Sequence, residues 1–304
     1  MMIPKTAIIS LFAIYLVQSG LNCAKKEIPF FDGELAYDYL KAQTEFGPRN
    51  PGSEGARLCR DYLIAELAGS ADQVTRQPFA FTDTKTDTSF ELTNIIASFN
   101  LDPQDGRRIL LMAHWDTRPR ADQESDIEKR KLPISGANDG ASGVAVLLQV
   151  AKVLREYPPP LGVDIVFFDG EDYGEEGYLD YYCLGSKHFA ENIGDYRPLY
   201  GVLLDIVGGR NSTFPMEGNS LRYAEDITRK IWDIAEEYNI DVLEKRMGPT
   251  VYDDHLIINQ AGIPSVDIID MDYPYWHTLE DTADKCDPEI LAQIGTLILA
   301  LIYE

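Results

Sequence analysis

The sequence is poor in the residues on which several common kinds of protein depend. Its 304 residues include 4 cysteines, none in a Cys-x-x-Cys spacing, which excludes a disulfide framework and a thiolate zinc site. Lysine and arginine total 27 against 50 aspartates and glutamates, a formal net charge of −23. Binding to nucleic acid or to anionic membranes rests on clustered positive charge. The composition therefore excludes nucleic acid as a partner and is typical of a solvated acidic surface.

The chain also lacks internal repeats, low-complexity runs and long linkers. Hydrophobic residues make up 45% of it, enough for a folded core, so an intrinsically disordered chain is excluded. These features predict a single domain over residues 23–304. No exposed apolar repeat is evident, and we expect a monomer.

The first 25 residues differ in composition from everything after them. The apolar run at residues 7–17 is eleven residues long, too short to cross a bilayer as a helix but typical of the apolar core of a signal peptide. We predict that residues 1–22 are a signal peptide and that the protein is exported, to the periplasm or outer membrane if bacterial and by secretion otherwise. Cys23 with the following Ala-Lys-Lys resembles the lipid-modified first residue of a bacterial lipoprotein, which would provide a lipid anchor.

The three remaining cysteines have separate interpretations. Cys59 lies on the apolar face of a helical pattern, so we expect it to pack in the core. Cys183 and Cys286 could form a disulfide in an oxidising compartment, and the sequence leaves this open.

Continuous apolar runs typical of buried strands alternate with helical patterns along the rest of the chain. This alternation predicts an α/β fold with a twisted, mostly parallel mixed sheet and helices on both faces. The expected helices span 33–46, 53–68, 141–157, 186–191, 221–238, 254–260 and 288–303, and the expected strands span 73–81, 90–99, 109–113, 163–168, 201–206 and 265–269.

Acidic residues and histidines stand where several of the expected strands end. His114 follows one strand, Glu171 and Asp172 lie just beyond the next, and Asp205 closes a third. His277 lies in the loop after the last strand. Since ligands of such sheets bind beyond the carboxyl ends of the strands, these side chains are candidates for one common site.

Zinc accepts imidazole nitrogen and carboxylate oxygen ligands, and the chain has only 4 histidines. His188 lies in a helical stretch and is interpreted as packing or surface, and His255 as a satisfied polar residue at a helix start. His114 and His277 stand beside carboxylates and are interpreted as candidate ligands. Asp139 precedes a helix, so it is either a ligand or a helix cap.

These residues carry a family resemblance. The resemblance is to the M28 family of zinc aminopeptidases, over nearly the whole chain after the leader. It is carried by His114-x-Asp116, the segment Gly-Ala-Asn-Asp139-Gly-Ala-Ser-Gly, Asp-Gly-Glu171-Asp172, Asp205 and His277. The family usually has glutamate where Asp172 stands.

Three further segments resemble the animal-type glutaminyl cyclases of this family, which convert N-terminal glutamine to pyroglutamate. They are Tyr-Asp253-Asp-His, Tyr-Trp276-His-Thr, and Leu-Leu-Asp205-Ile-Val-Gly followed by Thr-Phe-Pro. Aminopeptidases usually have serine where Asp253 stands.

The resemblance implies one zinc bound by Asp139, Asp172 and His277. If the carboxylates of Asp205 and Asp253 lie against one another, they share a proton and bind a second metal poorly. His114 then supports the site without binding metal. In the aminopeptidase alternative, His114 and Asp205 help to bind a second zinc.

The resemblance also implies roles in catalysis, on peptides or proteins with N-terminal glutamine. Glu171 carries a proton from the α-amine to the departing nitrogen, while Asp205 and Asp253 orient the reacting groups. Trp276 walls the pocket, unless it merely packs against the sheet edge. The substrate pocket is also expected to involve Tyr273 and Tyr275.

Two other functions use the same residues. In an aminopeptidase, Glu171 deprotonates a water that attacks the first peptide bond. The other function is that of a catalytically silent zinc-binding or peptide-binding module. Binding alone, however, does not need a general base beside a metal ligand.

Overall fold

The computed structural model describes residues 27–304. Within this part of the chain no helix is long and apolar enough to cross a membrane. The predicted signal peptide at residues 1–22 and the predicted lipid attachment at Cys23 lie outside the described residues.

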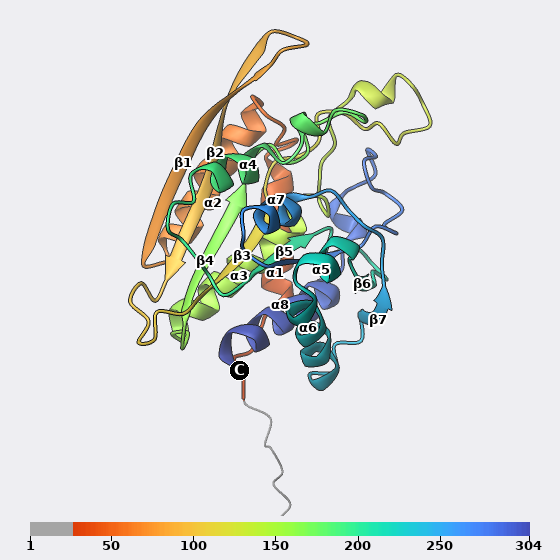
Figure 1. The fold of residues 1–304 in the computed structure, drawn as a ribbon. Helices are drawn as coiled ribbons and strands as arrows, with labels where there is room; N and C mark the ends of the chain where they lie inside the picture. Colours follow the sequence, from red (N-terminus) through yellow and green to blue (C-terminus); the bar gives the residue numbers. More distant parts are fainter. Residues whose placement is uncertain (1–26) are drawn as a thin grey trace, which may run out of the picture.

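A six-stranded sheet with the order β1-β2-β4-β3-β5-β8 forms the centre of the molecule (Figure 1). The last four strands in this order run parallel, whereas β1 and β2 add an antiparallel hairpin at one edge. The predicted α/β fold with a mostly parallel mixed sheet is therefore confirmed. The strands are β1 (Gln73–Asp83), β2 (Thr88–Phe99), β3 (Arg108–His114), β4 (Gly162–Phe168), β5 (Gly201–Asp205) and β8 (Ser265–Ile269).

Helices cover both faces of the sheet. α1, α3 and α8 lie on one face, and α4 and α7 lie on the other (Figure 1). Strand β3 shows why both faces are apolar, because Leu111 and Ala113 join the core under the first layer and Leu110 and Met112 the core under the second. The helices are α1 (Gly33–Glu45), α2 (Glu54–Ala68), α3 (Ala141–Glu156), α4 (Leu184–Glu191), α5 (Gly218–Tyr223), α6 (Glu225–Glu237), α7 (Asp254–Gln260) and α8 (Pro288–Tyr303), with short 3-10 turns at Lys129–Lys131, Leu179–Tyr181 and Ala283–Lys285.

The predicted helix 221–238 is in fact two helices. The first, α5, begins before residue 221, because Glu217 caps the amides of Asn219 and Ser220. The two helices separate at Ala224, where the backbone leaves helical geometry. Acidic residues then open α6, where negative charge stabilises a helix N-terminus. A short parallel pair, β6 (Phe214–Met216) with β7 (Leu243–Met247), was not predicted.

The three cysteines of the described residues are all buried free thiols. Cys59 is fully buried in α2, as expected for a core residue. Cys183 and Cys286 are both buried free thiols, so the open question of a disulfide between them is answered in the negative.

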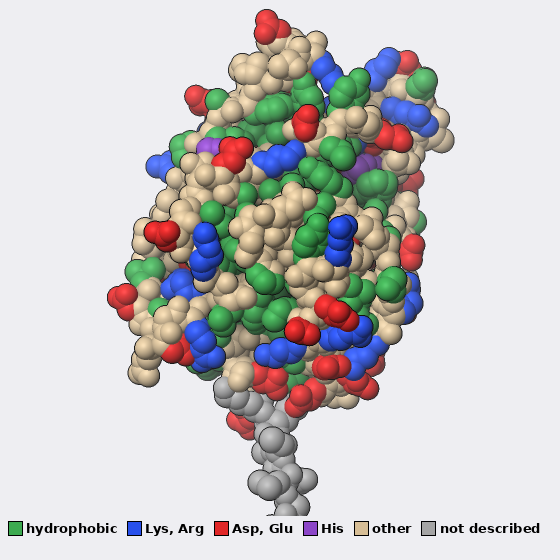
Figure 2. Space-filling view, viewed as in Figure 1, with side chains coloured by type: hydrophobic (Ala, Val, Ile, Leu, Met, Phe, Trp, Pro, Cys, Tyr) green, Lys and Arg blue, Asp and Glu red, His purple; other side chains and the backbone are tan. Residues whose placement is uncertain are grey.

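Charged side chains are dispersed over the visible surface. On the face in Figure 2, acidic and basic side chains are interspersed between apolar and neutral ones. This view agrees with a solvated acidic surface.

Close packing of α3 against β5 sets the position of the loop before α3, and Gly143 permits it. A Cβ at Gly143 would lie 2.2 Å from the carbonyl oxygen of Leu204. We expect Gly143→Ala to lower the free energy of unfolding by about 1–3 kcal/mol, measured by urea denaturation. Gly69→Ala is the control, because a Cβ there meets nothing nearer than 3.4 Å. Equal stability of the two variants would contradict the close-packing argument.

Candidate metal centre and active site

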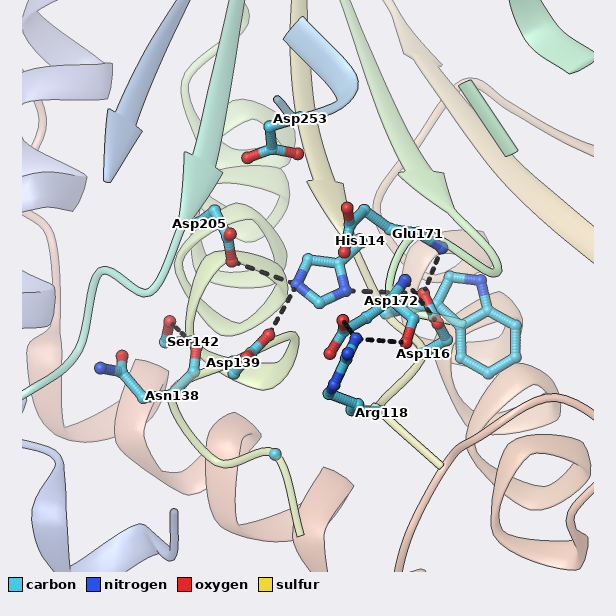
Figure 3. A network of polar contacts seen from close by, with 12 residues as sticks. His114, Asp116, Arg118, Asn138, Asp139, Ser142, Glu171, Asp172, Asp205 and Asp253 are labelled. Atoms are coloured by element: carbon cyan, nitrogen blue, oxygen red, sulfur yellow. Dashed lines mark hydrogen bonds and ion pairs between the residues drawn. The ribbon is translucent and has the colours of Figure 1, made fainter. Parts of the chain in front are cut away.

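The candidate site lies at the edge of the sheet where the parallel strands end (Figure 3). His114 is the last residue of β3 and Asp205 the last of β5, while Glu171 and Asp172 stand in the loop after β4. All four are buried. The structure thus brings together the strand-end residues that the sequence pattern singled out.

One group of possible ligands consists of Asp139, Asp172 and His277, whose ligand atoms all lie within 4.8 Å of one another. Nε2 of His277 is 3.5 Å from Oδ2 of Asp139 and 3.5 Å from Oδ1 of Asp172. Oδ2 of each aspartate is buried without a hydrogen-bond partner. Because an unpaired buried carboxylate oxygen is unfavourable, this donor set fits a bound cation, and its imidazole and carboxylates suit zinc.

A second group of possible metal ligands consists of His114, Asp139 and Asp205, so it shares Asp139 with the first. Nε2 of His114 lies 3.1 Å from Oδ1 of Asp205 and 3.3 Å from Oδ1 of Asp139. Burial disfavours the charged imidazole, but the surrounding carboxylates, Asp205 foremost, outweigh it and raise the pKa of His114 well above its usual value. This arrangement accommodates either a proton on His114 or a second metal, and the count of one zinc stays a prediction.

The backbone around Asp139 is fixed by a neighbouring loop. The amides of Asn138 and Asp139 donate to the carboxylate of Asp281 at 2.8 and 3.2 Å. Gly140, with φ of 100°, occupies the N-cap position of α3. The alternative of Asp139 as a helix cap is therefore wrong, because its side chain is turned to His114 instead.

Glu171 has the environment of an acid–base group. Its amide donates to Oδ1 of Asp116 at 3.0 Å, and the amide of Asp172 donates to Oδ2 of Asp116 at 3.3 Å, so one buried carboxylate fixes the turn. Burial, and then the charges of Asp253 and Asp172, raise the pKa of Glu171 well above its usual range. A carboxyl group in this state can both take up and release a proton.

Asp253 and Asp205 line the same cavity and each has another hydrogen-bond partner. Oδ1 of Asp253 caps α7 by accepting from the amide of Asp254, and Oδ2 is buried without a partner. Asp205 turns to His114 instead. Burial and the charge of Asp205 raise the pKa of Asp253 to about 7, and the shared proton stays a prediction.

The two other histidines stay outside the ligand groups around Asp139. His188 stacks on Phe79 with ring centroids 4.6 Å apart, as expected for a packing residue. His255 is fully buried, and its Nε2 lies 3.0 Å from Oε2 of Glu217. Its interpretation as a satisfied polar residue holds at this nitrogen, whereas Nδ1 has no hydrogen-bond partner.

A cavity opens above the ligand groups and continues into a wider groove of about 500 Å³. Trp276 lines both and stacks on His277 with ring centroids 3.8 Å apart. Tyr273 and Tyr275 are not among the described residues that line either space. Tyr273 instead donates its hydroxyl to Asp281 at 2.9 Å, and Tyr275 packs edge-on against Tyr273. In this structure Tyr273 therefore contacts the site through Asp281, and Tyr275 packs against Tyr273.

Several residues around the site were not identified from the sequence. Arg49 is fully buried and donates to the carbonyl oxygens of three residues in the loops that carry Asp116 and Asp139, namely Trp115, Ser135 and Gly136. Arg118 contacts Asp172, and Asp122 contacts His277. Arg118 could have been identified from the sequence, because it lies two residues beyond the His114-x-Asp116 motif. Arg49 is not close to any of the motifs, so the sequence gives no indication of its role.

Comparison with known proteins agrees with this site. The sequence profile of peptidase family M28 matches residues 94–302. The crystal structure of Bacteroides thetaiotaomicron glutaminyl cyclase bound to N-acetylhistamine superposes with a TM-score of 0.87 at 39% identity, over 91% of this chain and 99% of that one. The glutaminyl-peptide cyclotransferase-like protein of Bos taurus is 24% identical over 84% of this chain and 72% of its own length. Aminopeptidase YwaD of Bacillus subtilis (strain 168) is 30% identical over 57% of this chain and 38% of its own length.

The chain therefore belongs to peptidase family M28. The family membership implied by the sequence motifs is confirmed.

Proposed function

We propose that this protein is a glutaminyl-peptide cyclotransferase, which converts N-terminal glutamine of peptides or proteins to pyroglutamate and releases ammonia. The observation that carries the proposal is the shared cavity of Asp253, Trp276 and the ligand group around Asp139. Asp253 and Trp276 belong to the segments that separated cyclases from aminopeptidases in the sequence. The similarity to the Bacteroides cyclase over 91% of the chain supports it.

The residues of the site can perform this reaction. A zinc held by Asp139, Asp172 and His277 would supply Lewis-acid chemistry toward the side-chain carbonyl of the substrate. The α-amine forms a bond to this carbonyl carbon, and the bond from that carbon to the amide nitrogen breaks. Glu171 takes the proton from the α-amine and gives it to the departing nitrogen, which leaves as ammonia.

The neighbouring side chains position the substrate. Asp205 and Asp253 face the cavity as hydrogen-bond acceptors for the α-amine and the departing amide. Holding both reacting groups of one glutamine replaces a bimolecular encounter by an intramolecular one. The indole of Trp276 forms an apolar wall.

One zinc per chain belongs to this proposal. The contact of His114 Nε2 with Oδ1 of Asp205 at 3.1 Å supports the interpretation of His114 as a hydrogen-bonding residue. Elemental analysis of the purified protein tests the count, and two tightly bound metals per chain would contradict it.

The reaction products separate cyclisation from hydrolysis. We expect the zinc-loaded protein to remove ammonia from a Gln-initiated peptide and to leave a Leu-initiated peptide of otherwise equal sequence unchanged. Mass spectrometry of both peptides measures this. Release of the first residue from either peptide would show that the protein is an aminopeptidase.

The aminopeptidase function is the second candidate, and one observation favours it. His114, Asp139 and Asp205 form a possible second metal site that shares Asp139 with the first. A non-catalytic zinc-binding or peptide-binding module fits less well, because it gives no reason for the buried Glu171 beside a ligand.

We also propose export through a signal peptide at residues 1–22, with lipid attachment at Cys23 and a monomeric domain over residues 23–304. The short apolar run at residues 7–17 supports export. The mass of the mature protein from its native host tests cleavage and lipidation together, and an unprocessed N-terminus would contradict both. Light scattering tests the monomer.

A further inference from the structure

Two of the proposed zinc ligands are connected to each other through Arg118 and Asp122. Nη1 of Arg118 donates to Oδ1 of Asp172 at 2.6 Å, while Nε and Nη2 donate to the two carboxylate oxygens of Asp122 at 3.0 and 2.5 Å. Oδ1 of Asp122 in turn lies 3.3 Å from Nδ1 of His277. The result is a continuous chain of polar contacts from one ligand to the other, of which Figure 3 shows the part between Arg118 and Asp172.

Arg118 is built into the site rather than placed at its surface. Its side chain is 1% exposed, and Nη2 also donates to the hydroxyl of Tyr182 at 3.1 Å. A buried guanidinium requires compensating charge, which Asp122 and Asp172 provide. Because the guanidinium is planar, bonding to one carboxylate through two nitrogens fixes the direction in which the third nitrogen points.

This geometry determines which atoms remain for a metal. Oδ1 of Asp172 is bonded to Arg118, whereas Oδ2 is buried without a partner. When Nδ1–H of His277 donates to Asp122, Nε2 remains unprotonated on the side of Asp139 and Asp172. Aspartate is one methylene shorter than glutamate, so Asp172 reaches the metal only if its carboxylate is held in place.

We propose that Arg118 is a positioning residue that holds the short Asp172 side chain, and through Asp122 also His277, in the geometry that binds zinc. Arg118 itself does not touch the metal or the substrate. This inference rests on the zinc site of the proposed function, but not on the reaction that the site performs.

Zinc affinity measured by competition with a chromophoric chelator tests the inference. We expect Arg118→Met to raise the dissociation constant for zinc by about 10–100-fold. Arg120→Met is the matched control, because Arg120 donates to the backbone carbonyl oxygens of Tyr173 and Gly174 just after Asp172 but contacts no ligand side chain. Its zinc affinity should change by less than about threefold, since the loss of loop support alone does not disturb the ligand atoms.

Two further variants distinguish positioning from a general effect on folding. Arg118→Lys keeps the charge but not the planar fork, so its zinc affinity should stay well below that of the original protein. In the Arg118→Met background, Asp172→Glu should restore zinc affinity, because the longer carboxylate reaches the metal without a partner. Urea unfolding of each apo variant gives the control for folding.

The possible results separate this inference from the proposed function. Equal loss of zinc affinity in Arg118→Met and Arg120→Met, unchanged affinity in Arg118→Met, full affinity in Arg118→Lys, or no recovery with Asp172→Glu would each overturn it. If the zinc results are as expected but the products are those of an aminopeptidase, the inference stands and the cyclase function fails. If pyroglutamate forms and the zinc affinity of Arg118→Met is unchanged, the reverse holds.

Discussion

Glu171→Gln is expected to lower kcat by about 10²–10⁴-fold while zinc affinity changes little, because the variant removes the proton carrier and leaves the ligand set intact. Glu171 is buried beside Asp172 but is not part of the group formed by Asp139, Asp172 and His277. Steady-state kinetics on a Gln-initiated peptide, with metal analysis of the same sample, measure both quantities.

The pH dependence of activity is a second, independent test of the role of Glu171. The raised pKa of Glu171 means that its basic form is lost as the pH falls through a value above the usual 4.3 or so for glutamate. Activity of the original protein should therefore fall on the acid side through this raised pKa. This fall in activity on the acid side should be absent from the pH profile of any residual activity of Glu171→Gln.

A control for Glu171 lies in the same loop. Glu176 is exposed and lines the outer groove, so Glu176→Gln should alter kcat by less than about twofold, since it carries no proton in the proposed reaction. If Glu171→Gln retained full kcat, Glu171 would have no part in the mechanism.

Asp139→Ala is expected to remove both zinc and activity. Asp139 is the carboxylate that both possible metal groups share, with Oδ2 facing His277 and Oδ1 facing His114. The loss of zinc affinity should therefore exceed the roughly 10–100-fold effect typical of residues that only support a ligand. Chelator competition and kinetics on the same preparation measure it.

His114→Asn is the informative comparison for Asp139→Ala. With one zinc per chain, the variant keeps a single tightly bound metal, because His114 is outside the group of Asp139, Asp172 and His277. With two zinc ions, its stoichiometry falls from two to one. Retention of full zinc affinity by Asp139→Ala would contradict the assignment of Asp139 as a ligand in either case.

The fold and the location of the site could be predicted from local signals. Apolar runs such as Ile109–Ala113 mark buried parallel strands without reference to the rest of the chain, and parallel strands place their carboxyl ends at one edge. His114 and Asp205 were therefore predicted to lie together although 91 residues separate them.

Side-chain partners could not be predicted in the same way. The orientation of Asp253 depends on where α7 begins, because its Oδ1 accepts from the first amide of that helix, while Asp205 turns to His114. Arg49 and Asp281 act through loops, which have no periodicity to mark an inward-facing position. Their partners are defined only once the strands have brought distant loops together.

The free thiols affect how the protein can be made. Since Cys59, Cys183 and Cys286 are buried and unbridged, folding of residues 27–304 needs no oxidation step and no disulfide isomerase. The domain should fold equally in a reducing cytoplasm and in an oxidising compartment, and reductants in a buffer should leave it intact. Export, as proposed, would then determine where the enzyme meets its substrates and would contribute nothing to the formation of its fold.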